Sequence, residues 1–169
     1  MSSTIVIYKS EYGATKQYAQ WIAQQLSCEL KDEKEAKKEK DLSKYDTIIY
    51  GGGIYAGGIK GVKIMTKNFQ TIKNKKLIVF TVGLTPIEAK DIYDGVEKSN
   101  FTKEMRESIK IYHLLGSIDY AKLSGVHAMM MKAANKMLRK KEGMEQAGKS
   151  RDFVNVQSAS PLVEFAKGV

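Results

Sequence analysis

Runs of apolar, largely β-branched residues recur along the chain and predict strands that are buried on both faces of a sheet. These runs occupy residues 4–8 (TIVIY), 46–50 (DTIIY), 76–82 (KLIVFTV) and 109–115 (IKIYHLL). Residues 29–32 (ELKD) are a weaker candidate for a short additional strand.

Between these runs the apolar positions follow the spacing of a helix. In residues 15–27, one stripe is formed by Ala19, Ile22, Ala23 and Leu26. Pro86 suits a first helical turn and is expected to open a helix that extends to about Val96. The other segments with helical character are residues 61–72, 101–108, 123–139 and 161–167, and residues 153–156 are a candidate edge segment.

Strands that alternate with helices predict an α/β fold, a doubly wound parallel sheet with helices on both faces. The chain shows no internal repeat and no Pro- or Ser-rich linker, so we expect a single domain over residues 1–169. Such sheets bind ligands at the carboxyl ends of their strands. The loops after Tyr8, Tyr50, Val82 and Leu115 are therefore the candidate site.

The first of these loops, residues 10–15, has the composition of an anion site. Its backbone N–H groups lead into a helix N-terminus, and the loop carries one glycine between hydroxyl groups. The candidate ligands for a terminal phosphate are Ser10, Tyr12, Gly13, Ala14, Thr15 and Lys16. The alternative is an ordinary helix cap provided by Ser10 or Thr15.

The second and third loops add glycines, an aromatic ring and small side chains at the same edge of the sheet. Glycine allows a close approach of backbone to ligand, and a tyrosine can stack on a flat ring, although glycine-rich loops are also simple turns. The candidate residues are Gly52, Gly53, Ile54, Tyr55, Ala56 and Gly57 in the second loop and Thr81, Val82, Gly83 and Leu84 in the third.

The stretch Ser10-Glu11-Tyr12-Gly13-Ala14-Thr15 resembles the phosphate loop of the flavodoxin-like, FMN-binding family at Ser10, Gly13 and Thr15. Tyr12 stands where that family usually has a threonine or serine. The resemblance implies FMN as the cofactor and a five-stranded sheet of order 2-1-3-4-5 with an inserted helix after the last core strand. It also implies that residues 54–57 and 81–84 hold the isoalloxazine, with Tyr55 as the stacking ring.

Within that family, residues 112–120 (YHLLGSIDY) and the closing residues 151–169 resemble the quinone-dependent protoporphyrinogen dehydrogenases of heme biosynthesis. Residues 155–158 (NVQS) stand where those enzymes have an aspartate–tryptophan element. The resemblance implies an FMN-dependent oxidoreductase with a porphyrinogen or other reduced substrate and a quinone or redox protein as acceptor. The alternative is an electron carrier of the flavodoxin type. No residue is nominated as a catalytic acid or base, and no cluster has the spacing of a metal site.

The charge of the chain bears on the choice between enzyme and carrier. The formal net charge is +9, and residues 47–87 contain no acid. The lysines of that stretch are Lys60, Lys63, Lys67, Lys73, Lys75 and Lys76. A positive surround stabilises an anionic reduced flavin and would raise its potential, which favours an electron-accepting enzyme. The alternative is that these lysines are merely solvated and do not act on the flavin.

A second basic segment, residues 123–141, combines lysines and arginine with a methionine-rich face. Such a helix can rest on an anionic membrane or pack as ordinary core. The start of the chain lacks the features of a signal peptide, and the single cysteine, Cys28, fits a reducing compartment. We therefore expect a cytoplasmic protein, with the inner face of the cell membrane as an additional location if this helix binds lipid. Nucleic acid is not an expected partner, because no recognised nucleic-acid motif accompanies the basic surface.

Overall fold

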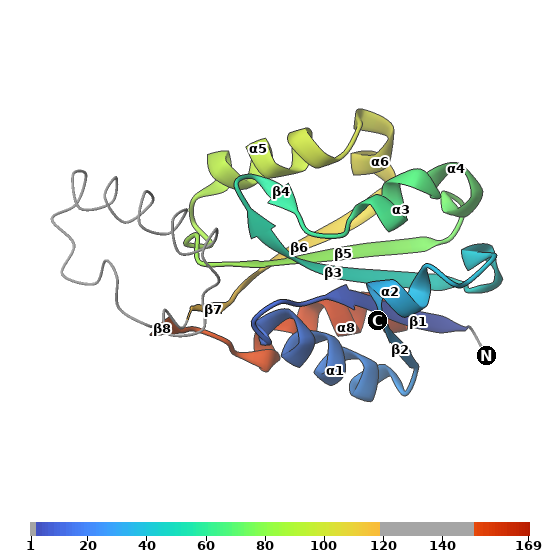
Figure 1. Ribbon diagram of the computed structural model, residues 1–169, viewed down its shortest axis with the longest axis horizontal. Helices are drawn as coiled ribbons and strands as arrows, with labels where there is room; N and C mark the ends of the chain where they lie inside the picture. The colour runs from blue at the N-terminus through green and yellow to red at the C-terminus, as the bar shows by residue number, and fades with distance from the viewer. Residues whose placement is uncertain (1–2, 119–150) are drawn as a thin grey trace, which may run out of the picture.

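The computed structural model describes residues 3–118 and 151–169 and shows a parallel sheet between two layers of helices (Figure 1). The parallel strands lie in the spatial order β2 (Glu29–Asp32), β1 (Thr4–Lys9), β3 (Thr47–Tyr55), β5 (Lys76–Gly83) and β6 (Ile109–Leu115). Counted along the chain, this is the order 2-1-3-4-5, which confirms the predicted doubly wound, flavodoxin-like sheet. The predicted strands at residues 29–32 and 109–115 have the bounds that the sequence indicated.

Two small additions accompany this sheet. Strand β4 (Gly58–Ile59) pairs antiparallel with the end of β3. Strands β7 (Ser117–Ile118) and β8 (Arg151–Asp152) pair antiparallel with each other beyond the end of β6.

The helices occupy both faces of the sheet, as the alternating pattern predicted. In Figure 1, α1 and α8 lie on one side of the sheet, and α3, α4, α5 and α6 lie on the other. The helices are α1 (Ala14–Leu26), α2 (Glu33–Ala36), α3 (Lys63–Lys67), α4 (Phe69–Ile72), α5 (Lys90–Asn100), α6 (Lys103–Ser108) and α8 (Ser160–Lys167), with short 3₁₀ turns η1 (Leu42–Lys44) and η3 (Val156–Ala159).

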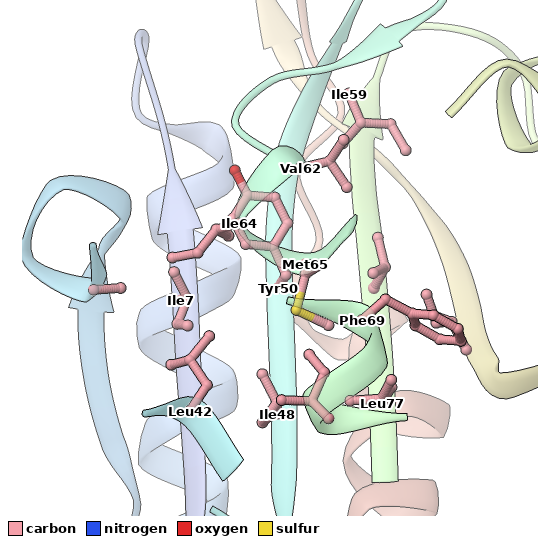
Figure 2. Close-up of a cluster of buried hydrophobic side chains, with 14 of the residues drawn as sticks. Ile7, Leu42, Ile48, Tyr50, Ile59, Val62, Ile64, Met65, Phe69 and Leu77 are labelled. Carbon is pink, nitrogen blue, oxygen red and sulfur yellow. The ribbon is translucent and has the colours of Figure 1, made fainter. Parts of the chain in front are cut away.

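The alternation of side chains along each strand divides the core into two layers. In β1, the side chains of Ile5 and Ile7 join the layer under α3, α4 and α5, whereas Val6 joins the layer under α1 and α8. Figure 2 shows the first layer, in which Tyr50 of β3 packs among residues of α3 and α4 such as Met65 and Phe69. Both faces are covered, and this explains why the strands read as continuous apolar runs rather than alternating ones.

The prediction that the second buried strand ends at Tyr50 is wrong. Strand β3 continues through the glycines, and Gly51, Gly52 and Gly53 pair in register with residues 80–82 of β5. The segment that looked like a loop is therefore mostly strand, and only Ala56 and Gly57 form the turn between β3 and β4.

The prediction of one helix over residues 61–72 is also wrong, because the segment forms two short helices that meet at Asn68. The side-chain amide of Asn68 donates to the carbonyl oxygen of Ile64 at 2.7 Å. In a continuous helix this oxygen would accept the backbone N–H of Asn68 instead. The asparagine side chain thus competes with the helical ladder and divides the segment.

Three further predicted bounds need correction. Pro86 opens a turn, in which the N–H of Ala89 donates to the Pro86 carbonyl, and α5 begins only at Lys90. Helix α6 begins at Lys103 because the Thr102 side chain accepts the N–H of Met105 and caps the helix there. The candidate edge segment 153–156 is not a strand, since the paired residues of β8 precede it.

Residues 31–44 contain α2 and η1 and contribute Ala36 and Leu42 to the core. The predicted helix at residues 123–139 and the proposed membrane-binding segment 123–141 lie outside the described residues. In the part of the chain that the structure describes, no helix is long and apolar enough to cross a membrane.

Candidate functional site at the carboxyl edge of the sheet

The register of the sheet brings the candidate loops to a single edge. Lys9 pairs with Gly52, Gly53 with Val82, and Gly83 with Leu115. The chain segments that follow these residues therefore lie side by side along the carboxyl edge, where doubly wound sheets bind their ligands.

The first loop presents an open helix N-terminus. Gly13 adopts φ of 100° and stands directly before α1, and within the described residues no side chain caps this helix. The hydroxyl oxygen of Ser10 accepts the N–H of Gly13 at 3.1 Å, so it shapes the loop and does not close the helix end. The N–H groups of the first turn have no carbonyl partner within the helix and remain directed outward.

This loop fits a phosphate. A β-carbon built on Gly13 would meet no atom within 4 Å, which shows that the space above the loop is open. Ser10 and Tyr12 are half-buried and Thr15 is buried. An uncapped helix end, an open cradle and neighbouring hydroxyl groups are the features of a backbone anion site.

The second loop is a tight β-hairpin. Ala56 and Gly57 both have positive φ, at 50° and 81°, as the two central positions of such a turn require. Tyr55 precedes this turn, and a β-carbon on Gly53 would lie 3.0 Å from the Tyr55 ring, so the ring lies back against the glycine. Gly52 instead faces the returning chain, since its β-carbon would come within 2.4 Å of the Lys60 carbonyl oxygen. The lack of a side chain at Gly53 therefore leaves room for the Tyr55 ring, whereas the lack of one at Gly52 leaves room for the backbone at Lys60.

A charged contact joins the first loop to the second. The ammonium of Lys60 lies 3.2 Å from Glu11 Oε1 and 5.3 Å from the centroid of the Tyr55 ring. Burial, together with the neighbouring Glu11 and Tyr12, raises the pKa of Tyr55 to about 12. At neutral pH the Tyr55 side chain is therefore uncharged, and the ammonium of Lys60 lies over its ring.

The third loop divides into an inner and an outer half. The inner residues Thr81 and Val82 are buried within the sheet, whereas Gly83 and Leu84 are partly exposed at its edge. The hydroxyl of Thr81 is engaged with Nδ1 of His113 at 2.6 Å. Gly83 and Leu84 are therefore the residues of this loop that a bound ring can reach.

Residues beyond the end of β6 complete the edge. The N–H of Gly116 donates to the carbonyl of Gly83 at 2.8 Å, and the N–H of Phe153 donates to the carbonyl of Gly116 at 3.0 Å. The hydroxyl of Tyr18 in α1 donates to the Leu115 carbonyl and accepts the N–H of Asn155. The β7–β8 ribbon is thus fixed beside the third loop.

Sequence reasoning missed the role of Glu11 and Lys60 as a link between loops. Glu11 lies in the first loop, which was chosen for its hydroxyl groups, and Lys60 lies in residues 47–87, which were chosen for their lysines. The pairing itself could not be found in the sequence, because the two residues meet only after the sheet has formed.

The lysines of residues 47–87 do not form a ring around this edge, contrary to the expectation from charge. Lys73, Lys75 and Lys76 lie where β5 begins, and β5 spans eight residues. At about 3.3 Å per residue they stand about 25 Å from the carboxyl edge, well beyond a screening length of about 8–10 Å. Lys60 is at the edge but is paired with Glu11. Three of the six lysines therefore lie too far from this edge to add to the expected positive surround.

The described residues contain no group of three or more His, Cys, Asp or Glu side chains that could hold a metal ion. The chemistry of this edge is that of a binding site for an anion and a flat ring, assembled from backbone groups, hydroxyls and one tyrosine.

Comparison with known proteins identifies the relatives of the chain. The flavodoxin domain family matches residues 5–145. Flavodoxin 1 from Bacillus cereus, solved in its oxidised form, is 18% identical with a TM-score of 0.50, covering 79% of this chain and 95% of that chain. The Trp repressor binding protein from Bacillus subtilis is 15% identical with a TM-score of 0.49, covering 85% of this chain and 99% of that chain. No curated protein sequence matches at a significant level.

The flavodoxin structure shows the same fold, and the family match spans most of the sequence, including the first, second and third loops. The FMN cofactor that the resemblance implied is the cofactor of this family, and the open cradle at Gly13 fits its phosphate. The chain belongs to the flavodoxin domain family, as an FMN-binding redox protein.

Proposed function

We propose that this protein is an FMN-dependent oxidoreductase of the protoporphyrinogen dehydrogenase type, which passes electrons from a reduced porphyrinogen to a quinone or redox protein. FMN would accept two electrons at a time, so that the six-electron oxidation of a porphyrinogen to a porphyrin takes three rounds, each followed by return of the electrons to the quinone or redox protein. The protein supplies binding, orientation and exclusion of water.

Different residues at the carboxyl edge are suited to different parts of the cofactor. The first turn of α1, with Gly13 and Ser10, is suited to the phosphate. The neutral Tyr55 ring is suited to stacking on the isoalloxazine, and the partly exposed residues Gly83 and Leu84 to contact with the edge of that ring.

The observation that carries the enzyme proposal is the position of the chain segment between β7 and β8. Its ends, Ile118 and Arg151, are paired with each other. They lie beyond Gly116, which is hydrogen-bonded to Gly83 of the third loop, as the ribbon at the end of β6 in Figure 1 illustrates. Both points at which residues 119–150 join the described chain, Ile118 and Arg151, therefore lie beside the cofactor edge.

An electron carrier is the second candidate. The observation that favours it is the placement of the lysines, because three of the six lie too far from the carboxyl edge to stabilise an anionic reduced flavin. In that case the flavin potential would be low and a one-electron reduced state would accumulate during reduction.

The test is anaerobic mixing of the FMN-loaded protein with protoporphyrinogen IX while flavin absorbance and porphyrin fluorescence are followed. We expect the flavin to bleach on mixing and porphyrin fluorescence to rise when a quinone is then added, because porphyrin formation removes six electrons and one FMN accepts only two. Porphyrin added in place of porphyrinogen is the control and should leave the flavin oxidised.

A variant in which a short turn joins Ile118 to Arg151 separates the two candidates. The enzyme proposal expects this variant to bind FMN and to lose the reaction with porphyrinogen. Equal reactivity of the variant would remove residues 119–150 from the substrate site. If the parent and the variant both bind FMN and both remain oxidised after mixing with porphyrinogen, this substrate is excluded and the electron carrier is favoured.

A further inference from the structure

A chain of polar contacts runs from the third loop into α5. The Thr81 hydroxyl lies 2.6 Å from Nδ1 of His113, and Nε2 of the same ring lies 2.8 Å from Oε1 of Glu97. Thr81 is fully buried, and the side chains of His113 and Glu97 are 14% and 27% exposed. The three side chains connect β5, β6 and α5 below the cofactor edge.

Tyr93 of α5 adds a second point of attachment. Its ring stacks on the His113 ring with centroids 4.0 Å apart and an interplanar angle of 22°. Its hydroxyl donates to the carbonyl of Thr85 at 2.6 Å. The segment from Thr81 to Thr85 is thus held at both ends by one cluster, which consists of Thr81, His113, Glu97 and Tyr93.

The donors and acceptors of this cluster are matched when the His113 ring is neutral. A carboxylate can only accept, so Nε2 of His113 carries the proton that faces Glu97. In the neutral ring Nδ1 is then the acceptor, and the Thr81 hydroxyl is its donor. Both ring nitrogens of His113 then have a partner, and buried networks that are satisfied in this way hold their members in one conformation.

We propose that this cluster is a positioning device that fixes the backbone of Gly83 and Leu84 for the flavin ring and thereby sets the affinity and the potential of the bound FMN. This inference rests on the proposed cofactor role of the third loop. None of the four side chains has to touch the cofactor. They act through Gly83 and Leu84, which lie between the attachment points Thr81 and Thr85 and whose backbone must keep its direction if it is to meet the ring.

Matched substitutions test the proposal. Thr81→Val removes the hydroxyl and keeps the shape, Thr81→Ser keeps the hydroxyl, and Tyr93→Phe removes only the contact with Thr85. Thr71→Val is the control, because Thr71 is exposed and its hydroxyl bonds to Asn68 in α4, away from the third loop.

Two measurements are made on each variant. The first is amide hydrogen exchange of residues 83–85 without FMN, and the second is the FMN dissociation constant together with the midpoint potential. We expect Thr81→Val and Tyr93→Phe to speed exchange at these residues and to weaken FMN binding by about tenfold with a shifted potential. Thr81→Ser and Thr71→Val should resemble the parent protein.

The outcomes separate the cluster from the cofactor assignment. Unchanged exchange at residues 83–85 in Thr81→Val and Tyr93→Phe would overturn the proposal. So would a lowered melting temperature accompanied by an unchanged dissociation constant and potential, since that is the signature of a purely structural role. If the variants exchange faster but the parent protein does not bind FMN, the cluster still holds residues 83–85 in place, and the proposed cofactor role of the third loop is refuted.

Discussion

The ring of Phe80 in β5 lies directly against the backbone of Gly51 in β3, its partner in the strand register. A β-carbon built on Gly51 would come within 2.0 Å of Cζ of that ring. The glycine is therefore part of the packing between two central strands, and a side chain at this position must displace a fully buried aromatic ring.

Gly51→Ala is expected to lower the free energy of unfolding by about 1–3 kcal/mol, because the methyl group overpacks the core. Denaturant unfolding measures this change. The control is Gly95→Ala in α5, where a β-carbon meets no atom within 4 Å. There the substitution should raise the free energy of unfolding by about 0.5–1 kcal/mol, the usual gain from replacing glycine in an exposed helix. Equal effects of the two substitutions would contradict the packing role of Gly51.

Gly13→Ala tests the first loop. The residue adopts φ of 100°, and its β-carbon would meet no neighbour, so the substitution strains the backbone without a steric clash. We expect a loss of about 1–2 kcal/mol in stability and a weaker affinity for FMN, measured by titration of flavin fluorescence. Gly168→Ala, at φ of 79° after α8, provides a strained control that should lose stability and keep the affinity. The same FMN affinity in both variants would argue against a phosphate at Gly13.

The titration of Tyr55 provides a test of the contact between the first two loops. Its pKa is raised to about 12, first by burial and then by Glu11 and Tyr12. Ultraviolet difference titration of the parent against Tyr55→Phe should show this tyrosine ionising well above the usual value of about 10. Glu11→Gln should lower the pKa of Tyr55, because it removes a negative charge that opposes the phenolate. A difference spectrum that develops near pH 10 would contradict the geometry.

Glu39 should make stability depend on pH in the acid range. Hydrogen bonds from Lys31 and Lys44 hold the pKa of this carboxyl at about 2, below the value of about 4.3 expected in the unfolded chain. A carboxyl with a depressed folded pKa stabilises the protein above the unfolded pKa, and this contribution disappears as the pH falls toward the folded pKa. The stability advantage of the parent over Glu39→Gln should therefore be constant above about pH 5 and vanish near pH 2. Denaturant unfolding at several pH values measures it, and an advantage that grows on acidification would refute the assignment.

The fold was predictable from the sequence because buried parallel strands leave a strong apolar signal. The strand at residues 109–115 and the start of α1 within one residue of position 15 followed from local pattern alone. The extension of β3 through Gly51 did not, because glycines suit both a loop and a strand pressed against an aromatic ring. Only the position of Phe80 decides between these two possibilities.

The location of the site could be predicted from the sequence, but most of the contacts between its residues could not. Topology alone brings the loops to one edge, and a glycine before α1 is a local signal. The pairing of Lys60 with Glu11, and the distance of Lys76 from the carboxyl edge, depend on the three-dimensional path of the chain. The lack of acidic residues in residues 47–87 did not predict the electrostatic field at the carboxyl edge, because the two ends of this stretch lie on opposite edges of the sheet.

The pairing of Ser117 and Ile118 with Asp152 and Arg151 has a consequence for how such proteins diversify. Because the connection between β7 and β8 leaves and returns at adjacent points, its length and sequence can vary while the strand register stays the same. Doubling the length of a flexible connection costs only about 0.6 kcal/mol. Relatives could therefore differ in this segment while inheriting the cofactor edge unchanged.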